Sequence, residues 1–402
     1  MPMSRRQPEI DAPLGLSLYV HVPFCRQRCP FCASYGVAGA EGQFDAFLRA
    51  LQREWSLAAA EETECAPESR AIASIYVGGG TPSMPGHAFL QDLLGMLTNA
   101  YPVREDCEIT VQLNPEDVDR ELARALVAAG FGRVSLGVQS FDDQALRAIG
   151  RGHSGQDATA AIESLREAGC ENLSLDLMFG LPGQSLGAWE ETLARALLCG
   201  PQHLGVHPLT RAEATTLDRL LTGSFSATPL SEETWHPYQR AAALLSEHGY
   251  TLYEITNAAL PGYECRHLLG VWSRAPLLGL GPAAHSLCGN RRWRTVCDLD
   301  LYLRSLRAQQ RPPRDSVRLD ALDQAREEIY LGLRRARGFT WAPLEARLPQ
   351  ATLERMRRKV RFLAAQGYLE LDEQGARLQP QARYVCDSVA LELINAVSGG
   401  AE

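Results

Sequence analysis

Six short runs of apolar and β-branched residues recur along the first half of the chain, each separated from the next by a segment of helical length. The intervening segments carry apolar side chains at helical spacing, as at Leu122, Leu126 and Val127, and Gly130 and Gly169 stand where helices of that length would end. The alternation of the two patterns predicts repeated strand–helix units around a parallel sheet. The six runs span residues 16–20, 74–77, 108–113, 133–138, 172–177 and 203–209.

Six strand–helix units in succession are typical of a whole or partial β/α barrel, in which chemistry gathers at the loops that leave the C-terminal ends of the strands. A doubly wound sheet is the alternative architecture. We expect an α/β fold with a partial (β/α)6 barrel that, with its extension, occupies residues 1–307. A stretch with Gln309, Gln310, Pro312 and Pro313 then marks a linker.

Residues 308–402 have a different pattern and are expected to form a second domain. Helical periodicity over residues 319–337 and 351–366 precedes Gly367, a short strand pair at residues 368–371 and 376–378, and a last helix that ends at Val397. This order resembles a winged helix, which predicts a helix-rich accessory domain.

The second of these C-terminal helices is basic, which raises a DNA-binding alternative. Acidic residues nearly balance the charge of this tail, so a solvated helix face is the favoured interpretation and a DNA-binding regulator is the alternative. The basic residues are Arg355, Arg357, Arg358, Lys359 and Arg361.

Composition limits the remaining function classes. The chain has 402 residues, of which 45% are hydrophobic and 22% charged, and a formal net charge of -8, so it is globular and has no general attraction to nucleic acid. No apolar run approaches the ~18 residues that span a bilayer, and the acidic, proline-containing N-terminal residues do not resemble a signal peptide. With eleven cysteines in such a chain, we expect reduced thiols and a cytoplasmic location rather than a disulfide framework.

The strongest chemical signal is a cysteine motif in the loop after the first predicted strand. Cys25, Cys29 and Cys32 follow the spacing Cys-x-x-x-Cys-x-x-Cys, which wraps a chain around one metal group. Three thiolates can hold three irons of a 4Fe-4S cluster and leave the fourth iron open for a ligand. Zinc is the alternative, but a closed zinc site needs a fourth ligand at close spacing, and the nearby His21 lies on the strand itself. The spacing therefore favours an iron–sulfur cluster.

This motif resembles that of the radical S-adenosylmethionine (SAM) superfamily. From about residue 17 onward, the chain resembles the group that contains oxygen-independent coproporphyrinogen III oxidases and HemW-type heme chaperones. The resemblance implies that Cys25, Cys29 and Cys32 bind the cluster. It also implies that the open iron binds the amino and carboxylate groups of SAM, which a reduced cluster can cleave to a deoxyadenosyl radical.

Three further loops match the SAM-contacting loops of this group: residues 78–83, residues 137–141 with Arg151 a helix later, and residues 175–184. The resemblance implies that Arg151 pairs with the SAM carboxylate and that Asp176 accepts hydrogen bonds from the ribose or the ammonium group. Considered alone, the glycines indicate a tight turn, and Gln139 and Asp176 indicate polar strand ends satisfied by neighbouring backbone. The implied SAM-binding residues are Tyr19, Phe31, Gly79, Gly80, Thr81, Gln112, Gln139, Arg151 and Asp176, with Gln112 in the strand end where related chains carry a glutamate.

Two features favour the heme chaperone over the oxidase within this group. The oxidase carries a longer N-terminal segment and a fourth cysteine two positions after the third, whereas no cysteine follows Cys32 at that position. Residues 265–272 keep the histidine and tryptophan of a heme chaperone motif, although they lack its asparagines and tyrosine. The resemblance implies that His267 ligates heme iron and that Trp272 stacks on the porphyrin. A satisfied structural histidine is the alternative for His267, and His285 is a second candidate ligand.

These features predict an iron–sulfur heme chaperone with SAM bound at the cluster and not necessarily turned over. Its expected cargo is heme, and its expected partners are apo-haemoproteins or respiratory-chain recipients. The alternative is a radical SAM enzyme that carries out decarboxylation like that of the oxidase, or other radical chemistry on a tetrapyrrole or another large substrate. Enzymatic turnover belongs to that alternative, and no catalytic residue is assigned.

Overall fold

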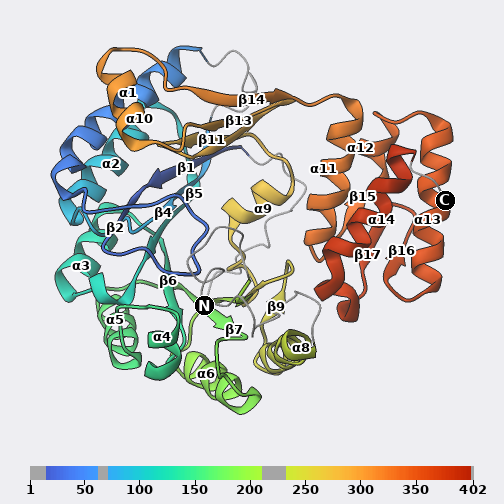
Figure 1. Ribbon diagram of the computed structural model, residues 1–402, viewed down its shortest axis with the longest axis horizontal. Helices are drawn as coiled ribbons and strands as arrows, with labels where there is room; N and C mark the ends of the chain where they lie inside the picture. Colours follow the sequence, from blue (N-terminus) through green and yellow to red (C-terminus); the bar gives the residue numbers. More distant parts are fainter. Residues whose placement is uncertain (1–14, 62–70, 211–231, 400–402) are drawn as a thin grey trace.

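A computed structural model describes residues 15–61, 71–210 and 232–399 of the chain. In this part of the chain, twelve strands form one curved sheet with helices on its outer side (Figure 1). The strands are β1 (Leu16–Val22), β4 (Ile72–Gly79), β5 (Val103–Leu113), β6 (Arg133–Gln139), β7 (Asn172–Phe179), β8 (His203–Pro208), β9 (Thr251–Leu252), β10 (Asn257–Ala259), β11 (Leu277–Leu280), β12 (His285–Cys288), β13 (Arg291–Thr295) and β14 (Arg314–Arg318).

The order of the strands distinguishes the two expected architectures. The strands β1, β4, β5, β6, β7 and β8 are neighbours in chain order and pair in parallel. Their order never reverses, as it would at the switch point of a doubly wound sheet. Within the described residues the sheet does not close, since β1 continues to the parallel strand β11 and β8 to the antiparallel strand β10. The predicted partial (β/α)6 barrel is therefore confirmed.

The helices that connect the strands end where the glycines predict. Helix α3 stops at Ala129 before Gly130, whose φ is 102°, and α5 stops at Glu167 shortly before Gly169, whose φ is 91°. Glycine adopts this left-handed conformation without the strain that a Cβ would add. Among the described residues, no helix combines the length and apolarity that crossing a bilayer requires. The helices up to the end of the barrel are α1 (Phe44–Glu61), α2 (His87–Ala100), α3 (Arg120–Ala129), α4 (Asp143–Ala148), α5 (Gly155–Glu167), α6 (Leu186–Leu198), α8 (Glu232–Glu247), α9 (Arg266–Trp272) and α10 (Leu299–Arg307).

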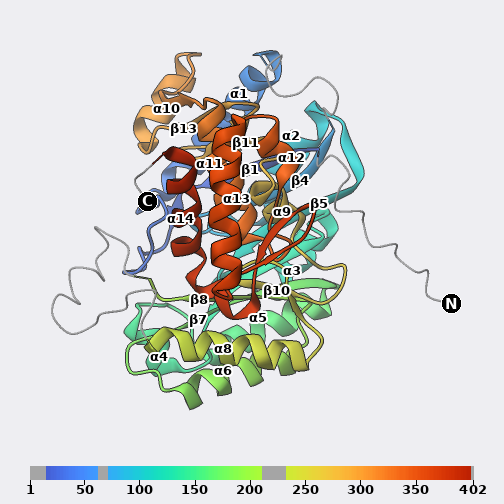
Figure 2. The ribbon, with the colours of Figure 1, turned by 90° about the vertical axis from the view of Figure 1, so that its right-hand side faces the viewer.

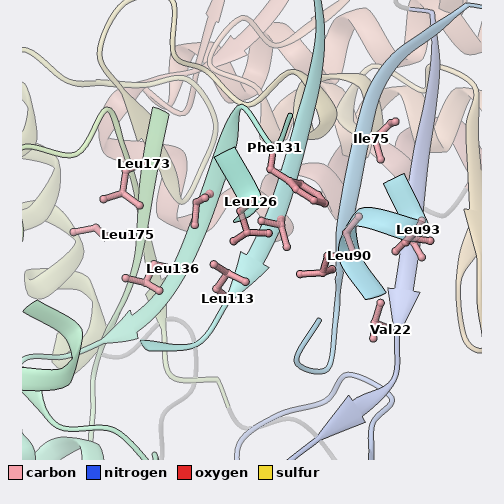
Figure 3. Close-up of a cluster of buried hydrophobic side chains, with 14 of the residues drawn as sticks. Val22, Ile75, Leu90, Leu93, Leu113, Leu126, Phe131, Leu136, Leu173 and Leu175 are labelled. Carbon is pink, nitrogen blue, oxygen red and sulfur yellow. The ribbon is translucent and has the colours of Figure 1, made fainter. Parts of the chain in front are cut away.

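One face of the parallel strands is apolar and packs against the helices. Leu18 and Val22 of β1 are fully buried and belong to the large hydrophobic cluster of the barrel. Figure 3 shows Val22 of β1 and Ile75 of β4 near Leu90 and Leu93 of α2, and all four belong to this cluster. Burial of these side chains holds the helices on the outer side of the sheet.

The opposite face of the strands is polar. Because successive side chains of a strand point to opposite faces, Ser17, Ser74, Ser135 and Asp176 point into the barrel. Ser74 Oγ donates to Ser17 Oγ at 3.0 Å, and Ser135 Oγ donates to Asp176 Oδ2 at 2.7 Å. The interior of the barrel is therefore lined by hydrogen-bonding groups, which an apolar core would not need and a bound polar ligand can use.

The C-terminal residues have a hydrophobic cluster of their own, which includes the fully buried Leu333, Met356 and Leu393. Their elements are α11 (Ala321–Arg334), β15 (Phe339–Thr340), α12 (Trp341–Glu345), α13 (Gln350–Ala365), β16 (Leu369–Leu371), β17 (Gly375–Leu378) and α14 (Cys386–Ser398). The three strands form a sheet in the order β15-β17-β16. Figure 2 looks onto the long helices α11, α13 and α14. The order of helices and hairpin is that of the winged-helix-like fold that the sequence predicts.

Basic residues of α13 find acceptors within the same C-terminal elements. Arg355 Nε donates to the Ala396 carbonyl at 2.5 Å, and Lys359 Nζ lies 3.0 Å from Glu392 Oε2. Both contacts join α13 to α14. They favour the accessory-domain interpretation over the DNA-binding alternative.

The C-terminal elements meet the barrel next to α9. Arg335 Nη1 donates to Ser273 Oγ at 2.9 Å, and Arg274 Nε lies 2.9 Å from Glu327 Oε2. Figure 1 shows α9 between the barrel strands and α11, and α9 contacts both β4 and α11. The helix that carries His267 is thus held from both sides.

Candidate functional site

The three cysteines of the motif lie in one loop that follows β1. Cys25 ends β2 (Phe24–Cys25), which pairs in parallel with β3 (Val37–Ala38) and so joins the two ends of the loop. The Cys32 amide donates to the Cys29 carbonyl at 3.1 Å and closes a turn between them. We call residues 25–36 the cysteine loop. Among the described residues, nine cysteines are free thiols, these three included, whereas Cys288 is disulfide-bonded, so the expectation of reduced thiols is wrong at Cys288.

A cavity of about 200 Å³, which we call the cysteine cavity, lies between this loop and the ends of the barrel strands. All three cysteines and every predicted SAM-binding residue except Asp176 line it. The predicted residues in its wall are Cys25, Cys29, Cys32, Tyr19, Phe31, Gly79, Gly80, Thr81, Gln112, Gln139 and Arg151. Further wall residues, which the sequence did not single out, include Arg28, Tyr35, Asn114 and Glu116. The structure thus brings together loops that are far apart in the sequence.

The thiols suit a 4Fe-4S cluster. Each thiolate of such a cluster binds a different iron, so the three sulfurs need to face one cavity rather than converge on one point. Within the described residues, no three His, Cys, Asp or Glu side chains are grouped to hold a single metal ion. Burial, followed by the charge of Cys32, raises the pKa of the Cys25 thiol to about 11. Iron would displace this proton, because a coordinated thiol is deprotonated.

The glycine turn after β4 packs directly against the cysteine loop. The Gly80 amide donates to the Val22 carbonyl at 2.7 Å, and the Thr81 amide donates to the Phe24 carbonyl at 2.6 Å. A Cβ at Gly80 would lie 2.4 Å from the Phe24 carbonyl oxygen and 2.9 Å from Cys25 Sγ. Since the backbone oxygen cannot move away cheaply, only glycine allows this approach.

Arg151 brings a buried positive charge to the cysteine cavity. Its side chain is 6% exposed, and its Nη2 donates to Asn114 Oδ1 at 2.8 Å and to the Gly137 carbonyl at 3.0 Å. Its Nη1 lies 3.6 Å from Cys29 Sγ. Its Nε is buried without a hydrogen-bond partner among the described residues. A guanidinium that is held in place but not fully satisfied suits an anionic ligand such as the SAM carboxylate.

Glu116 supplies the carboxylate that Gln112 does not. Its Oε2 lies 3.8 Å from Arg151 Nη2 and 3.2 Å from His153 Nδ1. Burial acts to raise the pKa of Glu116, but the hydrogen bond with His153 and the charge of Arg151 outweigh it and hold the pKa below its usual value. An ionised carboxylate thus lines the cavity and can accept a hydrogen bond from the SAM ammonium.

Two other predicted residues differ in how the structure uses them. Gln139 ends β6 with a φ of 63°, next to a shift of register against β7. A non-glycine residue in this conformation is strained, and such strain is common at functional sites. Asp176, in contrast, does not line the cysteine cavity. It lies within β7 and accepts its 2.7 Å hydrogen bond from Ser135 inside the barrel.

A second cavity of about 730 Å³ adjoins the first. It shares Tyr19, Arg28, Ser34 and Tyr35 with the cysteine cavity. We call it the histidine cavity, because three histidines line it. Its other wall residues include His21, Tyr76, His267, Leu268, Val271, His285, Arg294 and Cys297. Trp272 is not among them, since its ring lies 4.9 Å from the Arg334 guanidinium toward α11.

The helix that carries His267 is anchored by a partly buried carboxylate inside the barrel. The amides of Arg266 and His267 each donate to the Glu108 carboxylate at 3.2 Å. These amides have no acceptor inside the helix, so the carboxylate caps its N-terminus. Glu108 therefore positions His267 at the wall of the histidine cavity.

The hydrogen bonds around His267 select the form that can bind a metal. Ser74 Oγ donates to Ser17 Oγ, and His267 Nδ1 lies 3.1 Å from the same Ser74 oxygen. When the Ser74 proton is used in the bond to Ser17, the matching tautomer of His267 donates from Nδ1 to Ser74, and in that tautomer the lone pair is on Nε2. Burial, followed by the charge of Arg133, lowers the pKa of His267 to about 3. The imidazole is therefore neutral at physiological pH.

Comparisons with known proteins agree with this arrangement. The family model described as the radical SAM superfamily matches residues 19–196, and the one described as the HemN C-terminal domain matches residues 319–385. The chain is 34% identical over 386 residues to the heme chaperone HemW of Mycobacterium tuberculosis, which covers 95% of each chain. This chain belongs to the HemW family of radical SAM proteins.

One further relative supports the assignment to the HemW family, and one solved structure supports the fold. The heme chaperone HemW of Bacillus subtilis is 33% identical over 325 residues, which is 81% of this chain and 84% of the relative. The solved structure of coproporphyrinogen III oxidase HemN, a radical SAM enzyme of Escherichia coli, superposes with a TM-score of 0.80 over 94% of this chain and 90% of the other, at 24% identity. The latter likeness concerns the fold. The resemblance predicted from the motifs is confirmed.

We predict that replacing any one of Cys25, Cys29 and Cys32 with alanine removes the cluster from this HemW-family protein, because one iron loses its only protein ligand. After anaerobic reconstitution, each variant should lack the brown absorbance and most of the bound iron. The matched control is Cys199→Ala, which removes a free and partly exposed thiol outside the cavity. Wild-type iron content in all three variants would contradict the prediction.

Arg151→Gln should weaken SAM binding to the reconstituted protein about tenfold or more, because the bound SAM carboxylate would lose its cationic partner. Calorimetric titration with SAM measures the loss. Arg147→Gln removes an exposed arginine from α4 and should bind SAM like the wild type. Equal SAM affinity in Arg151→Gln and wild type, with the cluster intact, would remove Arg151 from the SAM site.

The pKa of His267 predicts how stability depends on pH in the heme-free protein. An unfolded histidine binds a proton below about pH 6.5, whereas the folded His267 binds one only near pH 3, so the folded state loses stability as the pH falls through this window. Between pH 7 and 5 this group accounts for about 2 kcal/mol of the unfolding free energy. Urea unfolding should therefore show that, between pH 7 and 5, the unfolding free energy of His267→Gln falls by about 2 kcal/mol less than that of the wild type.

The exposed His248 provides the control for this experiment. His248→Gln should lose as much stability as the wild type between the two pH values. The same loss in wild type and His267→Gln would show that His267 is protonated freely and is not held neutral.

Proposed function

We propose that this chain binds heme in the histidine cavity and passes it to apo-haemoproteins, while SAM is held at a 4Fe-4S cluster in the cysteine cavity. The observation that carries the proposal is the buried His267, which lines a large cavity next to the cysteine loop. The proposal is supported by the relatives that match most of the chain, which are heme chaperones by name. We further propose that the recipients include respiratory-chain haemoproteins and that the protein acts in the cytoplasm.

Membership of the radical SAM superfamily gives the chain its two resident cofactors, a 4Fe-4S cluster and SAM. A cluster with one open iron can bind SAM and supply the electron that cleaves it. In our proposal, Cys25, Cys29 and Cys32 hold three irons. Arg151 and Glu116 meet the oppositely charged ends of the SAM methionine group. The main chain of the glycine turn, residues 78–80, keeps SAM close to the cysteine loop.

Heme binding uses the other cavity. A pocket of about 730 Å³ falls in the range of pockets that hold large ligands. Neutral imidazole is a ligand for heme iron, and the proton on Nδ1 fixes the ring through Ser74. Tyr76 and Tyr19 place aromatic rings 5.2 and 6.3 Å from the His267 ring and add apolar surface for a porphyrin. We also propose that residues 1–307 carry both cavities and that residues 308–402 form an accessory domain.

A second candidate function is radical chemistry on a tetrapyrrole. The shared wall of the two cavities favours it, since a ligand beside Tyr19 would also lie next to SAM. Such an enzyme would have to form 5′-deoxyadenosine in multiple turnovers when its substrate is present. The chaperone requires only that heme enters and leaves.

His267→Ala should lose the heme spectrum of the wild type. Titration of the anaerobic protein with heme should give a Soret band of ligated heme in the wild type and in His248→Ala, whose histidine is exposed and outside the cavity. In His267→Ala the band should shift or collapse, because iron loses its imidazole ligand. An identical band in His267→Ala would contradict the ligand assignment.

Transfer and turnover then separate the two functions. Mixing the heme-loaded protein with an excess of apo-myoglobin should move heme to the acceptor, while 5′-deoxyadenosine stays below one equivalent per chain. A wild-type protein that takes up no heme, yet forms 5′-deoxyadenosine in multiple turnovers with a tetrapyrrole, would overturn the chaperone and favour the enzyme.

A further inference from the structure

The histidine cavity has a buried wall and an exposed mouth. His267 is 5% exposed and belongs to the buried wall. His285 and Arg294 line the same cavity but are exposed, with 46% of the Arg294 side chain accessible. They are direct partners in the antiparallel ladder of β12 and β13. Their side chains therefore stand on the same face of the sheet, close to each other.

Arg294 is accessible to a ligand from solvent. Its Nη2 lies 3.4 Å from Asp315 Oδ2, and that carboxylate side chain is 85% exposed. An exposed and long ion pair of this kind contributes little free energy, so a better placed carboxylate can replace Asp315. Its neighbour Arg292 differs, since its Nε is paired with Glu327 at 2.9 Å and it does not line the cavity.

His285 adds a donor to this mouth without adding a charge. Partial burial, followed by the charges of Arg294 and Arg292, lowers the pKa of His285 below its usual value. The neutral ring keeps one N–H group for an acceptor. Arg28 contributes a further positive charge at the wall shared by the two cavities, where its guanidinium donates to the carbonyls of Gly36 and Cys32.

We propose that Arg294, with His285 beside it, binds the propionate carboxylates of heme at the mouth of the histidine cavity, with the macrocycle directed toward His267. The inference rests on the proposed function and deepens it. Heme carries two carboxylates on one edge of an otherwise apolar ring. Those carboxylates are stable where water and a guanidinium meet them and costly to bury unpaired. The exposed arginine and the buried histidine therefore define which edge of heme enters first.

The carboxylate of SAM has the same chemistry as a propionate, so the test must separate the two sources. Soret titrations compare heme with heme dimethyl ester, whose propionates are blocked, on wild type, Arg294→Gln and Arg318→Gln. Arg318 is an exposed arginine of β14 outside the cavity, and Arg318→Gln removes the same charge as Arg294→Gln. Calorimetry compares the SAM affinity of the same three proteins.

Arg294→Gln should bind heme about tenfold more weakly than wild type, with the Soret band at the same position because His267 still ligates the iron. Arg318→Gln should bind heme like the wild type. All three proteins should bind the dimethyl ester with equal affinity, and all three should bind SAM equally. Arg294→Lys should recover part of the heme affinity, which confirms that the charge and not the fold is responsible.

Three outcomes would overturn the inference. Equal heme affinity in Arg294→Gln and wild type would remove the propionate contact. An equal loss for heme and for its dimethyl ester would assign Arg294 to the shape of the cavity rather than to a carboxylate. A loss of SAM affinity alone would assign Arg294 to SAM. If the wild type binds neither porphyrin, the proposed function itself fails, and this inference fails with it.

Discussion

Both cavities depend on strand β1 and on the alternation of its side chains. Leu18, Val20 and Val22 are buried in the cluster between the sheet and the helices, which fixes the rotation of the strand. Tyr19 and His21 must then point into the barrel, since a shift by one residue would move every apolar side chain to the wrong face. Hydrophobic packing on one side of the strand thus aims the functional side chains on the other.

The consequences of this constraint extend along β1. Ser17 accepts the hydrogen bond of Ser74, and the Ser74 oxygen lies 3.1 Å from His267 Nδ1. Tyr19 stands in the wall of both cavities. His21 Nε2 lies 2.8 Å from the Tyr35 carbonyl and ties the strand to the far end of the cysteine loop. One strand therefore connects the proposed cluster site with the proposed heme site.

The sequence predicts the parts of this structure that repeat or that have a fixed spacing. The six parallel strands follow from apolar periodicity, and the cysteine cavity follows from a motif whose loops all leave the same ends of these strands. Glu116 and Asn114 were not predicted, because polar residues just beyond a strand carry no periodic signal. Asp176 was predicted to contact SAM, and it lies on a strand whose end reaches the site. Periodicity gives the face of the strand on which a residue lies, but not how far the residue is from the end of the strand.

The histidine cavity was harder to predict for a topological reason. Its mouth lies on β12 and β13, which extend the sheet with antiparallel strands and stand outside the strand–helix repeat. His285 and Arg294 become neighbours through the pairing of β12 with β13, and no motif in the sequence predicts this pairing. Sequence alone could identify His267 and His285 as candidates, whereas their different burial, and hence their different roles, required the folded structure.

In the proposed function, heme binds beside the iron–sulfur cluster, at His267. The most direct test is electron paramagnetic resonance of protein that carries both the reduced cluster and one equivalent of ferrous heme, which the reduced cluster leaves unchanged and which is high-spin and paramagnetic when one histidine ligates it. Two paramagnetic centres in adjoining cavities shorten each other's spin relaxation. We therefore expect the cluster signal to broaden and relax faster when heme is bound, and we expect this effect to be lost in His267→Ala. A cluster signal that one bound equivalent of heme leaves unchanged would contradict the claim.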